Sequence, residues 1–286
     1  MNKAEPQVIE SQNGIFGHVQ NSCSFVDLVK IAVRGVRRKR VEEAIVVEST
    51  PAIGGRGRVY ARCVRAHHLI SGNPLQLAYG LMRKFSHVSP FSLTVWSDSA
   101  PVTCAEVQLV LDGFFRRGYR ADVSSAEITF DVARLPYWLA TRDLCTRART
   151  LHEISDGNGK RTTYAGSSRS PWQMRIYQKT PGLLRIEFVV RSRFLRKHAI
   201  REPQSLYLVK RVPLFDCVGF RFFGPSRSLT LSDKNVQQTF GLVLRTSVPG
   251  SWVETMLRKE GVDPRPWLRR SELENTLRKM LANFIW

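Results

Sequence analysis

Seven residues able to act on a phosphate group recur at alternate positions in three short segments of the chain. They are Arg175, Tyr177 and Lys179 in residues 174–179, Arg185 and Glu187 in residues 184–190, and Glu127 and Asp131 in residues 125–132. Because side chains alternate between the two faces of a strand, each segment would turn these residues to one face and its apolar residues to the other. If the three strands share a sheet, a tyrosine hydroxyl meets three carboxylates and three basic groups. Such a set can hold a divalent cation beside an oxygen nucleophile. This combination suits a nucleophile that acts on a phosphate group.

The same residues also have a purely structural interpretation. Tyr177 could be a strand tyrosine at the surface of a sheet, where tyrosine is common. The carboxylates could form ordinary cross-strand ion pairs with Arg175 and Arg185. Three carboxylates on one face would repel one another without a cation, and this favours the metal site.

Other aromatic residues and histidines are interpreted as structural. Tyr164, Trp138 and Trp172 are expected to pack rather than to stack on nucleic-acid bases. His67 and His68 are adjacent, so on a strand they would point to opposite faces and are not expected to share a metal ion.

The chain of 286 residues carries 44 lysines and arginines against 24 aspartates and glutamates, a formal net charge of +20. An excess of this size implies a polyanionic partner, with nucleic acid as the leading candidate. No apolar run approaches the length of a membrane-spanning helix, so no membrane partner is expected. The first twenty-odd residues lack the apolar core of a signal peptide, and the five cysteines show no paired spacing. We therefore expect a cytoplasmic protein with reduced thiols.

The elements that would position the charged residues alternate between strands and helices. Strands are predicted over residues 24–33, 91–96 and 125–132, and helices begin at Asn73-Pro74, at the capping box Thr103/Glu106 and near Pro136. In the first strand, Phe25, Asp27, Val29 and Ile31 are expected to share one face. The order of elements predicts an α+β fold with a largely antiparallel central sheet and flanking helices.

The turn at Pro181-Gly182 determines whether Tyr177 and Glu187 can share a face. A two-residue loop would place Ile186 opposite Tyr177 and would turn Glu187 to the other side of the sheet. We therefore expect a loop of odd length, with the glycine in a left-handed conformation.

Two further capping boxes, Ser251/Glu254 and Ser271/Glu274, lie near the C-terminus. The second would open a terminal helix whose buried stripe is Leu273, Leu277, Leu281 and Phe284.

The segments Tyr164-Ala-Gly-Ser-Ser-Arg-Ser170, Arg175-Ile-Tyr-Gln-Lys179 and Leu184-Arg-Ile-Glu-Phe188 resemble the core of the Rep_trans family. These proteins are rolling-circle replication initiators of plasmids, some phages and integrative elements. Ala126 to Asp131 is similar to the acidic strand that precedes these motifs in the family. Order and spacing agree from roughly residue 25 to 191, although Glu127 stands where the family more often has aspartate.

The resemblance implies a fold like that of the HUH endonucleases and a nicking and closing enzyme for origin DNA. Tyr177 would attack a phosphodiester and form a 5′-phosphotyrosine link, with Mg²⁺ or Mn²⁺ held by Glu127, Asp131 and Glu187. Arg175, Lys179 and Arg185 would clamp the phosphate or lower the pKa of Tyr177. Further phosphate contacts would come from Ser168, Arg169 and Arg191.

The implied organisation is a flexible lead-in over residues 1–24, a catalytic core over 25–191, and a C-terminal part over 192–286 that supplies origin contacts. The DNA would be supercoiled or single-stranded. A host helicase and polymerase are expected partners, and a homodimer is conceivable. Two other functions stay open: a relaxase of an integrative or conjugative element with the same chemistry, and a basic DNA-binding regulator without catalysis.

Overall fold

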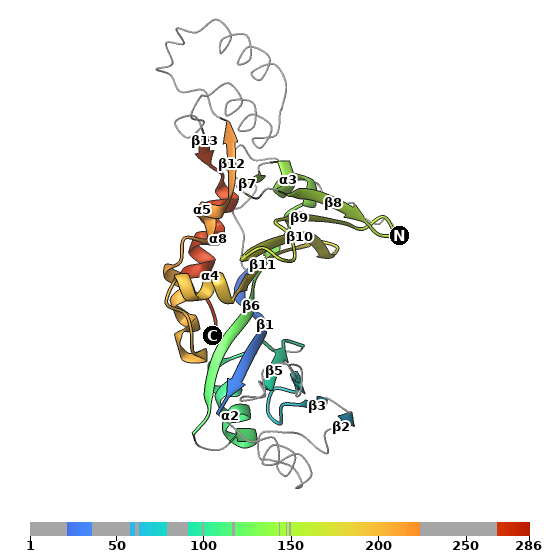
Figure 1. Cartoon of the computed structure of the whole chain (residues 1–286). Coiled ribbons are helices and arrows are strands. Elements are labelled where there is room, and N and C mark those ends of the chain that lie inside the picture. The colour runs from blue at the N-terminus through green and yellow to red at the C-terminus, as the bar shows by residue number, and fades with distance from the viewer. Residues whose placement is uncertain are drawn as a thin grey trace, which may run out of the picture.

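The computed structural model describes residues 22–35, 58–60, 63–78, 91–98, 100–115, 118–142, 144–146, 148, 150–223 and 268–286. Ten strands of the described residues form one sheet in the order β2-β3-β4-β5-β1-β6-β11-β10-β9-β8, and every neighbouring pair is antiparallel (Figure 1). Their bounds are β1 Cys23–Arg34, β2 Arg58–Tyr60, β3 Cys63–His67, β4 Pro74–Ala78, β5 Phe91–Trp96, β6 Arg120–Ala133, β8 Leu151–Ser155, β9 Arg161–Ala165, β10 Trp172–Thr180 and β11 Leu183–Arg191. The predicted α+β class with a largely antiparallel central sheet is confirmed.

Short helices and a small second sheet complete the described fold. The helices are α2 Cys104–Phe115, α3 Tyr137–Arg142, α4 Ser192–Lys197, the 3-10 helix η1 Pro203–Arg211, α5 Leu214–Cys217 and α8 Glu272–Ala282. The second sheet has the order β13-β12-β7, with β7 Leu144–Thr146, β12 Val218–Phe223 and β13 Leu268–Arg270. Figure 1 shows α4, η1 and α8 gathered beside the long central strands β1 and β6. No helix in the described part of the chain has the length and apolar character needed to cross a bilayer.

A single hydrophobic cluster joins the sheet to the C-terminal segments. It contains residues from β1 and β6 together with Phe194 of α4, Leu206 of η1 and Phe215 of α5. The predicted terminal helix is confirmed: Ser271 accepts a hydrogen bond from the Glu274 backbone N–H, and all four residues of the predicted stripe are buried. The described residues after Arg191 therefore pack into the same core as the sheet. Ser251/Glu254 lies outside the described residues.

Helix α2 begins with the predicted capping box. The Glu106 N–H donates to Thr103 Oγ1 at 3.2 Å, and the Thr103 N–H donates to Glu106 Oε2 at 3.4 Å. The Glu106 carboxylate is buried and also accepts hydrogen bonds from Ser71 Oγ and Asn73 Nδ2. The cap thereby anchors the β3–β4 turn to the start of the helix.

The helix predicted from Asn73-Pro74 is wrong over the described residues, because Pro74–Ala78 forms strand β4. Asn73 does not cap a helix; its side chain is buried, donates to Glu106 and accepts from the Asp98 backbone N–H at 3.0 Å. Leu75 and Leu77 alternate with polar residues and both are buried, which is a strand period rather than a helical one. Residues 79–90 lie outside the described residues.

Candidate active site on the central sheet

Two rows of side chains cross the sheet where β6, β11 and β10 lie side by side. In one row Asp131 of β6 opposes Arg185 of β11, which opposes Tyr177 of β10. In the next row Glu187 of β11 lies between Thr129 of β6 and Arg175 of β10. The three predicted strands are therefore neighbours, and their charged residues share one face as expected.

The expected loop of odd length is not found, because the β10–β11 turn has two residues; a bulge in β10 supplies the odd residue that this register needs instead. Thr180 pairs with Leu183 across Pro181-Gly182, whereas Gln178 pairs with Leu184, so Lys179 is an extra residue on β10. Gly182 has φ +83°, the left-handed conformation that was predicted. The extra residue is a bulge in the strand next to a two-residue turn, and it keeps Tyr177 and Glu187 on the same face.

The Tyr177 hydroxyl donates a hydrogen bond to Glu187 Oε1 at 2.7 Å. Tyr177 is half-buried and Glu187 is 2% exposed. Burial raises the pKa of Tyr177 above its ordinary value, and the charge and hydrogen bond of Glu187 raise this pKa further. The phenol is therefore held protonated beside a carboxylate that can accept its proton.

Arg175 joins two of the carboxylates on this face. Its Nη2 donates to Glu127 Oε2 at 2.7 Å. Its Nε lies 2.6 Å from Glu187 Oε2, but neither atom has a hydrogen bond with acceptable geometry. We regard this contact as an ion pair, because the charges are in contact while the N–H does not point at the oxygen. The structural interpretation of these residues as cross-strand ion pairs is thus realised around Arg175.

Asp131 is held by basic side chains rather than placed with the other two predicted ligands. Arg185 donates two hydrogen bonds to it, from Nε to Oδ1 at 2.6 Å and from Nη2 to Oδ2 at 2.7 Å. Lys179 Nζ lies 3.7 Å from Oδ2. A carboxylate that accepts a bidentate arginine has both oxygens engaged, so Asp131 fits the part of an anchor for Arg185 better than that of a metal ligand.

Asp27 of β1 takes the place in the cluster that was predicted for Asp131. Asp27, Glu127 and Glu187 each offer an oxygen, and these atoms all lie within 4.8 Å of one another. Asp27 is the extra residue of a β-bulge, because Val26 pairs with Ile128 and Leu28 pairs with Glu127 on β6. Its carboxylate also lies 3.5 Å from Arg185 Nη1.

The bulge also corrects the predicted face of the first strand. Phe25 and Asp27 were expected to share a face with Val29 and Ile31, but the extra residue reverses the alternation, so that Val29 and Ile31 point into the core. A charged residue in an otherwise apolar set was the signal in the sequence that could have identified Asp27.

The electrostatics of this cluster fit a divalent cation. Burial raises the pKa of both Asp27 and Glu127. For Glu127 the charges of Glu187 and Asp27 add to the shift while Arg175 opposes it, and for Asp27 the charge of Arg185 is the largest opposing effect. The arginines thus compensate the negative charge only in part. Glu187 Oε2 is buried and accepts no hydrogen bond. Three carboxylates whose oxygens lie within 4.8 Å of one another form a suitable ligand set for Mg²⁺ or Mn²⁺, although Arg175 Nε already pairs with Glu187 Oε2.

The raised pKa of Asp27 predicts an unusual dependence of stability on pH. Because the folded chain binds this proton more tightly than the unfolded chain, the protonated group contributes stability below its ordinary pKa, and this contribution is lost as the pH rises through the raised pKa. Without metal, we expect Asp27→Asn to be at least as stable as the unaltered protein at neutral pH, and its advantage to shrink as the pH falls. Urea unfolding across this range, with the exposed Asp98→Asn as control, measures the difference. A variant that loses stability at neutral pH would contradict the prediction.

The other predicted phosphate contacts lie in or beside the loop between β9 and β10. Ser168 and Arg169 are exposed in this loop. Arg191 instead supports the loop from β11: its Nη1 donates to the Ser170 carbonyl at 2.9 Å, and its Nη2 donates to Gln173 Oε1 at 3.4 Å. Arg169 is thus available to a phosphate, whereas Arg191 holds the loop that carries it.

The predictions for residues outside this cluster have mixed outcomes. His68 is buried and its Nδ1 contacts Ser71 Oγ, so it belongs to the β3–β4 turn and not to the candidate metal cluster. Trp172 packs against the core as expected. Trp138 was expected to pack, but it is 62% exposed on α3. The helix is short and turns this ring away from the core.

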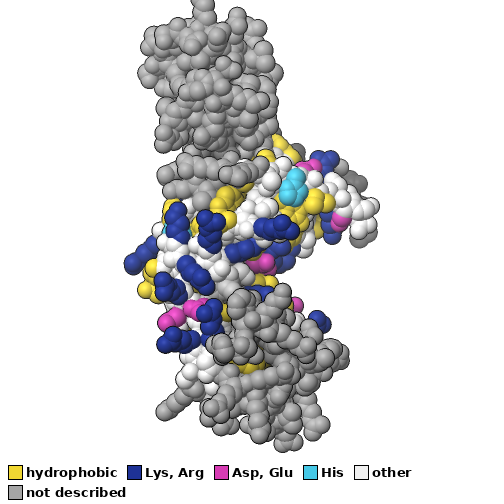
Figure 2. Space-filling view, in the orientation of Figure 1, with side chains coloured by type: hydrophobic (Ala, Val, Ile, Leu, Met, Phe, Trp, Pro, Cys, Tyr) yellow, Lys and Arg dark blue, Asp and Glu magenta, His cyan; other side chains and the backbone are white. Residues whose placement is uncertain are grey.

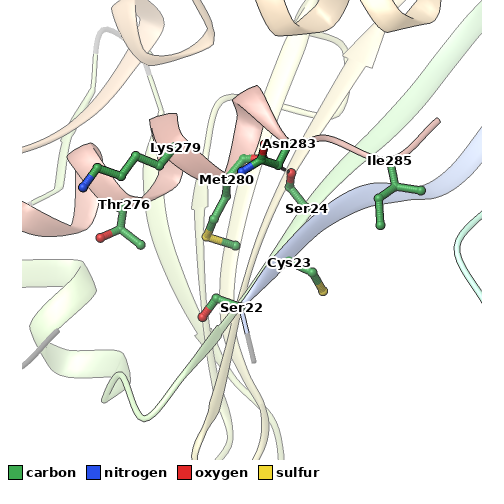
Figure 3. A pocket seen from close by; sticks show the side chains of 8 residues that line it. All are labelled: Ser22, Cys23, Ser24, Thr276, Lys279, Met280, Asn283 and Ile285. Atoms are coloured by element: carbon green, nitrogen blue, oxygen red, sulfur yellow. Dashed lines mark hydrogen bonds between the residues drawn. The ribbon is translucent and has the colours of Figure 1, made fainter. Parts of the chain in front are cut away.

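A separate pocket of about 380 Å³ lies between the start of β1 and α8 (Figure 3). It is lined by Ser22, Cys23, Ser24, Thr276, Lys279, Met280, Asn283 and Ile285. Ser24 Oγ donates to the Met280 carbonyl at 2.7 Å, which fixes the helix against the strand. None of the predicted site residues lines this pocket, and its residues offer no acidic cluster.

A scan against known protein families finds none that matches the chain, and a search of curated proteins finds no significant match.

Proposed function

We propose that the protein is a rolling-circle replication initiator that nicks and rejoins origin DNA through Tyr177, on a fold of the HUH-endonuclease type. The observation that carries the proposal is the hydrogen bond of 2.7 Å from the Tyr177 hydroxyl to Glu187, beside the Asp27 and Glu127 carboxylates. The resemblance of residues 164–188 to the Rep_trans motifs supports the same function.

In this proposal Glu187 acts as the general base. The raised pKa of Tyr177 means that the phenol would not ionise before the reaction. It would lose its proton to Glu187 Oε1 as its oxygen attacks phosphorus, and the 3′-oxygen of the broken strand would leave. The 5′-phosphotyrosine that forms keeps the energy of the phosphodiester, so a returning 3′-hydroxyl can reseal the strand.

Basic side chains next to Tyr177 would hold the phosphate. Arg185 lies directly opposite Tyr177 in the sheet, and Lys179 is an exposed neighbour on the same strand. Asp27, Glu127 and Glu187 would hold a divalent metal ion, which when bound supplies positive charge to the phosphoryl oxygens. Asp131 would keep Arg185 aimed across the face.

A basic surface beyond the sheet would bind the rest of the DNA. Figure 2 shows lysines and arginines gathered over the part of the molecule that carries α4 and η1. Exposed basic residues in this part are Arg193, Arg196, Lys197, Arg201, Lys210 and Arg211. Their position after Arg191 agrees with the proposal that residues 192–286 supply origin contacts, with sequence reading added by side chains that reach base edges.

The test is to incubate the protein with Mn²⁺ and supercoiled DNA that carries its own gene and flanking sequence. We expect open circles with protein covalently attached on a denaturing gel, and nuclease digestion followed by mass spectrometry should locate a nucleotide on Tyr177. Supercoiled DNA without the flanking sequence is the control. Absence of any adduct on the cognate DNA, with binding retained, would reject catalysis and leave a DNA-binding regulator.

A further inference from the structure

The row of side chains that contains Glu187 continues to the edge of the sheet. Arg175 of β10 directly opposes Tyr164 of β9, and Tyr164 directly opposes His152 of β8. Residues that directly oppose one another across antiparallel strands point to the same face, so all of these side chains share the face of Tyr177. β8 is the last strand of the sheet, and nothing in the described part of the chain pairs with its outer edge.

Tyr164 and His152 form a stacked aromatic pair on this face. Their ring centroids lie 5.1 Å apart and the ring planes differ by 8°. Tyr164 is half-buried and His152 is exposed. Tyr164 therefore does not pack in the core as its sequence had indicated. Tyr164 lies next to Arg175 in the row, whereas His152 is the outermost residue and is exposed to solvent. One end of the stacked pair is therefore open to solvent.

We propose that the His152–Tyr164 pair is a stacking platform for an unpaired base of single-stranded nucleic acid that runs across the sheet toward Tyr177. A flat, exposed imidazole over a tyrosine accepts the face of any base, because every base has a π-face. His152 is two strand spacings, roughly 10 Å, from Arg175, which is within reach of a nucleotide near the phosphate at Tyr177. A paired base would not fit, because both of its faces are covered by its neighbours in the duplex.

Charge complementarity supports a nucleic-acid strand as the occupant. The loop that follows β9 carries exposed Arg169, and the β8–β9 turn carries exposed Lys160. These residues lie at the two ends of β9, with the stacked pair between them. A backbone of phosphates crossing β8 and β9 would meet positive charge on either side, while its bases would meet aromatic rings.

This inference rests on the proposed function for its direction toward Tyr177, but its test requires no nicking. Fluorescence anisotropy with EDTA present would compare a labelled short oligothymidylate with an abasic oligomer of the same length. For His152→Ala and Tyr164→Ala, we expect affinity for oligothymidylate to fall between about fivefold and about a hundredfold. Affinity for the abasic oligomer should stay unchanged, because phosphate contacts remain.

Three control variants make the result decisive. Tyr164→Phe and His152→Phe keep a stacking ring and should bind oligothymidylate like the unaltered protein, which separates stacking from folding. Ile70→Ala shortens an exposed apolar side chain of the β3–β4 turn, outside the proposed DNA-binding surfaces, and should have no effect. Unchanged binding of both alanine variants to oligothymidylate, or equal losses on both oligomers, would overturn the platform. If the platform variants behave as expected while no adduct forms at Tyr177, the proposed function fails and the platform stands.

Discussion

Tyr177→Phe is expected to abolish the covalent DNA adduct and to leave DNA binding intact. The substitution removes only the hydroxyl, which is the attacking atom, and keeps the aromatic ring on β10. Loss of a catalytic nucleophile lowers a rate by several orders of magnitude, so nicking should fall by about a thousandfold or more. The measurement is adduct formation on a denaturing gel, with DNA affinity followed by anisotropy.

The structure also predicts that this variant stays folded. The hydroxyl donates a hydrogen bond to Glu187, whose other oxygen keeps its ion pair with Arg175. The expected cost in unfolding free energy is therefore about 1 kcal/mol. Tyr164→Phe is the matched control, since it removes a hydroxyl one strand away. An adduct that persists in Tyr177→Phe and disappears in Tyr164→Phe would assign the nucleophile to Tyr164.

The face that carries Tyr177 could be predicted because its pattern is local. Alternation within β10 and β11 places Tyr177 and Glu187 on one side, provided that one extra residue corrects the register, and in the structure the bulge at Lys179 supplies this residue. The left-handed conformation of Gly182 could be predicted from the dipeptide Pro181-Gly182. That the three strands share a sheet was a condition of the prediction and was not itself predicted. The structure satisfies this condition, because β6, β11 and β10 are neighbours.

Asp27 and β4 could not be placed because their positions depend on distant contacts. The bulge that turns Asp27 to the site arises where β1 pairs with β6, about a hundred residues further along the chain. Asn73 looks like a helix cap in isolation, yet Glu106 and Asp98 satisfy its amide from other elements. Local propensity is overridden where tertiary hydrogen bonds are available.

The ion-pair partners of the acidic residues could likewise not be predicted from local sequence. The sequence places three carboxylates and two arginines on one face, but spacing alone does not say which arginine grips which carboxylate. In the structure Arg185 binds Asp131 through two hydrogen bonds, while Arg175 divides its contacts between Glu127 and Glu187. Mutual repulsion of the carboxylates is thus relieved in part without a cation, and it is Asp27 that completes the candidate metal cluster.

This division of partners gives Asp131→Ala a large expected effect on stability. Arg185 is only 6% exposed, and its remaining carboxylate contacts, to Asp27 at 3.5 Å and Glu187 at 4.0 Å, are long. Removing one partner of a buried ion pair leaves an uncompensated charge, which costs about 3–5 kcal/mol. Urea unfolding without metal should show this loss for Asp131→Ala and no loss for Asp27→Asn, although both residues are acidic neighbours of Arg185.

Stabilisation by Mn²⁺ should depend on the same two positions in the opposite order: substitution of Asp27 should remove it, and substitution of Asp131 should not. A bound ligand stabilises the folded state in proportion to its occupancy, so Mn²⁺ should raise the melting temperature of the unaltered protein. Asp131→Asn, which keeps an oxygen near Arg185, should retain most of this rise because Asp131 lies outside the cluster of Asp27, Glu127 and Glu187. Asp27→Asn should lose it, because one of three charged ligands is gone. If Mn²⁺ instead stabilises Asp27→Asn fully and fails to stabilise Asp131→Asn, Asp131 is the ligand, and Arg185 must release it when the metal binds.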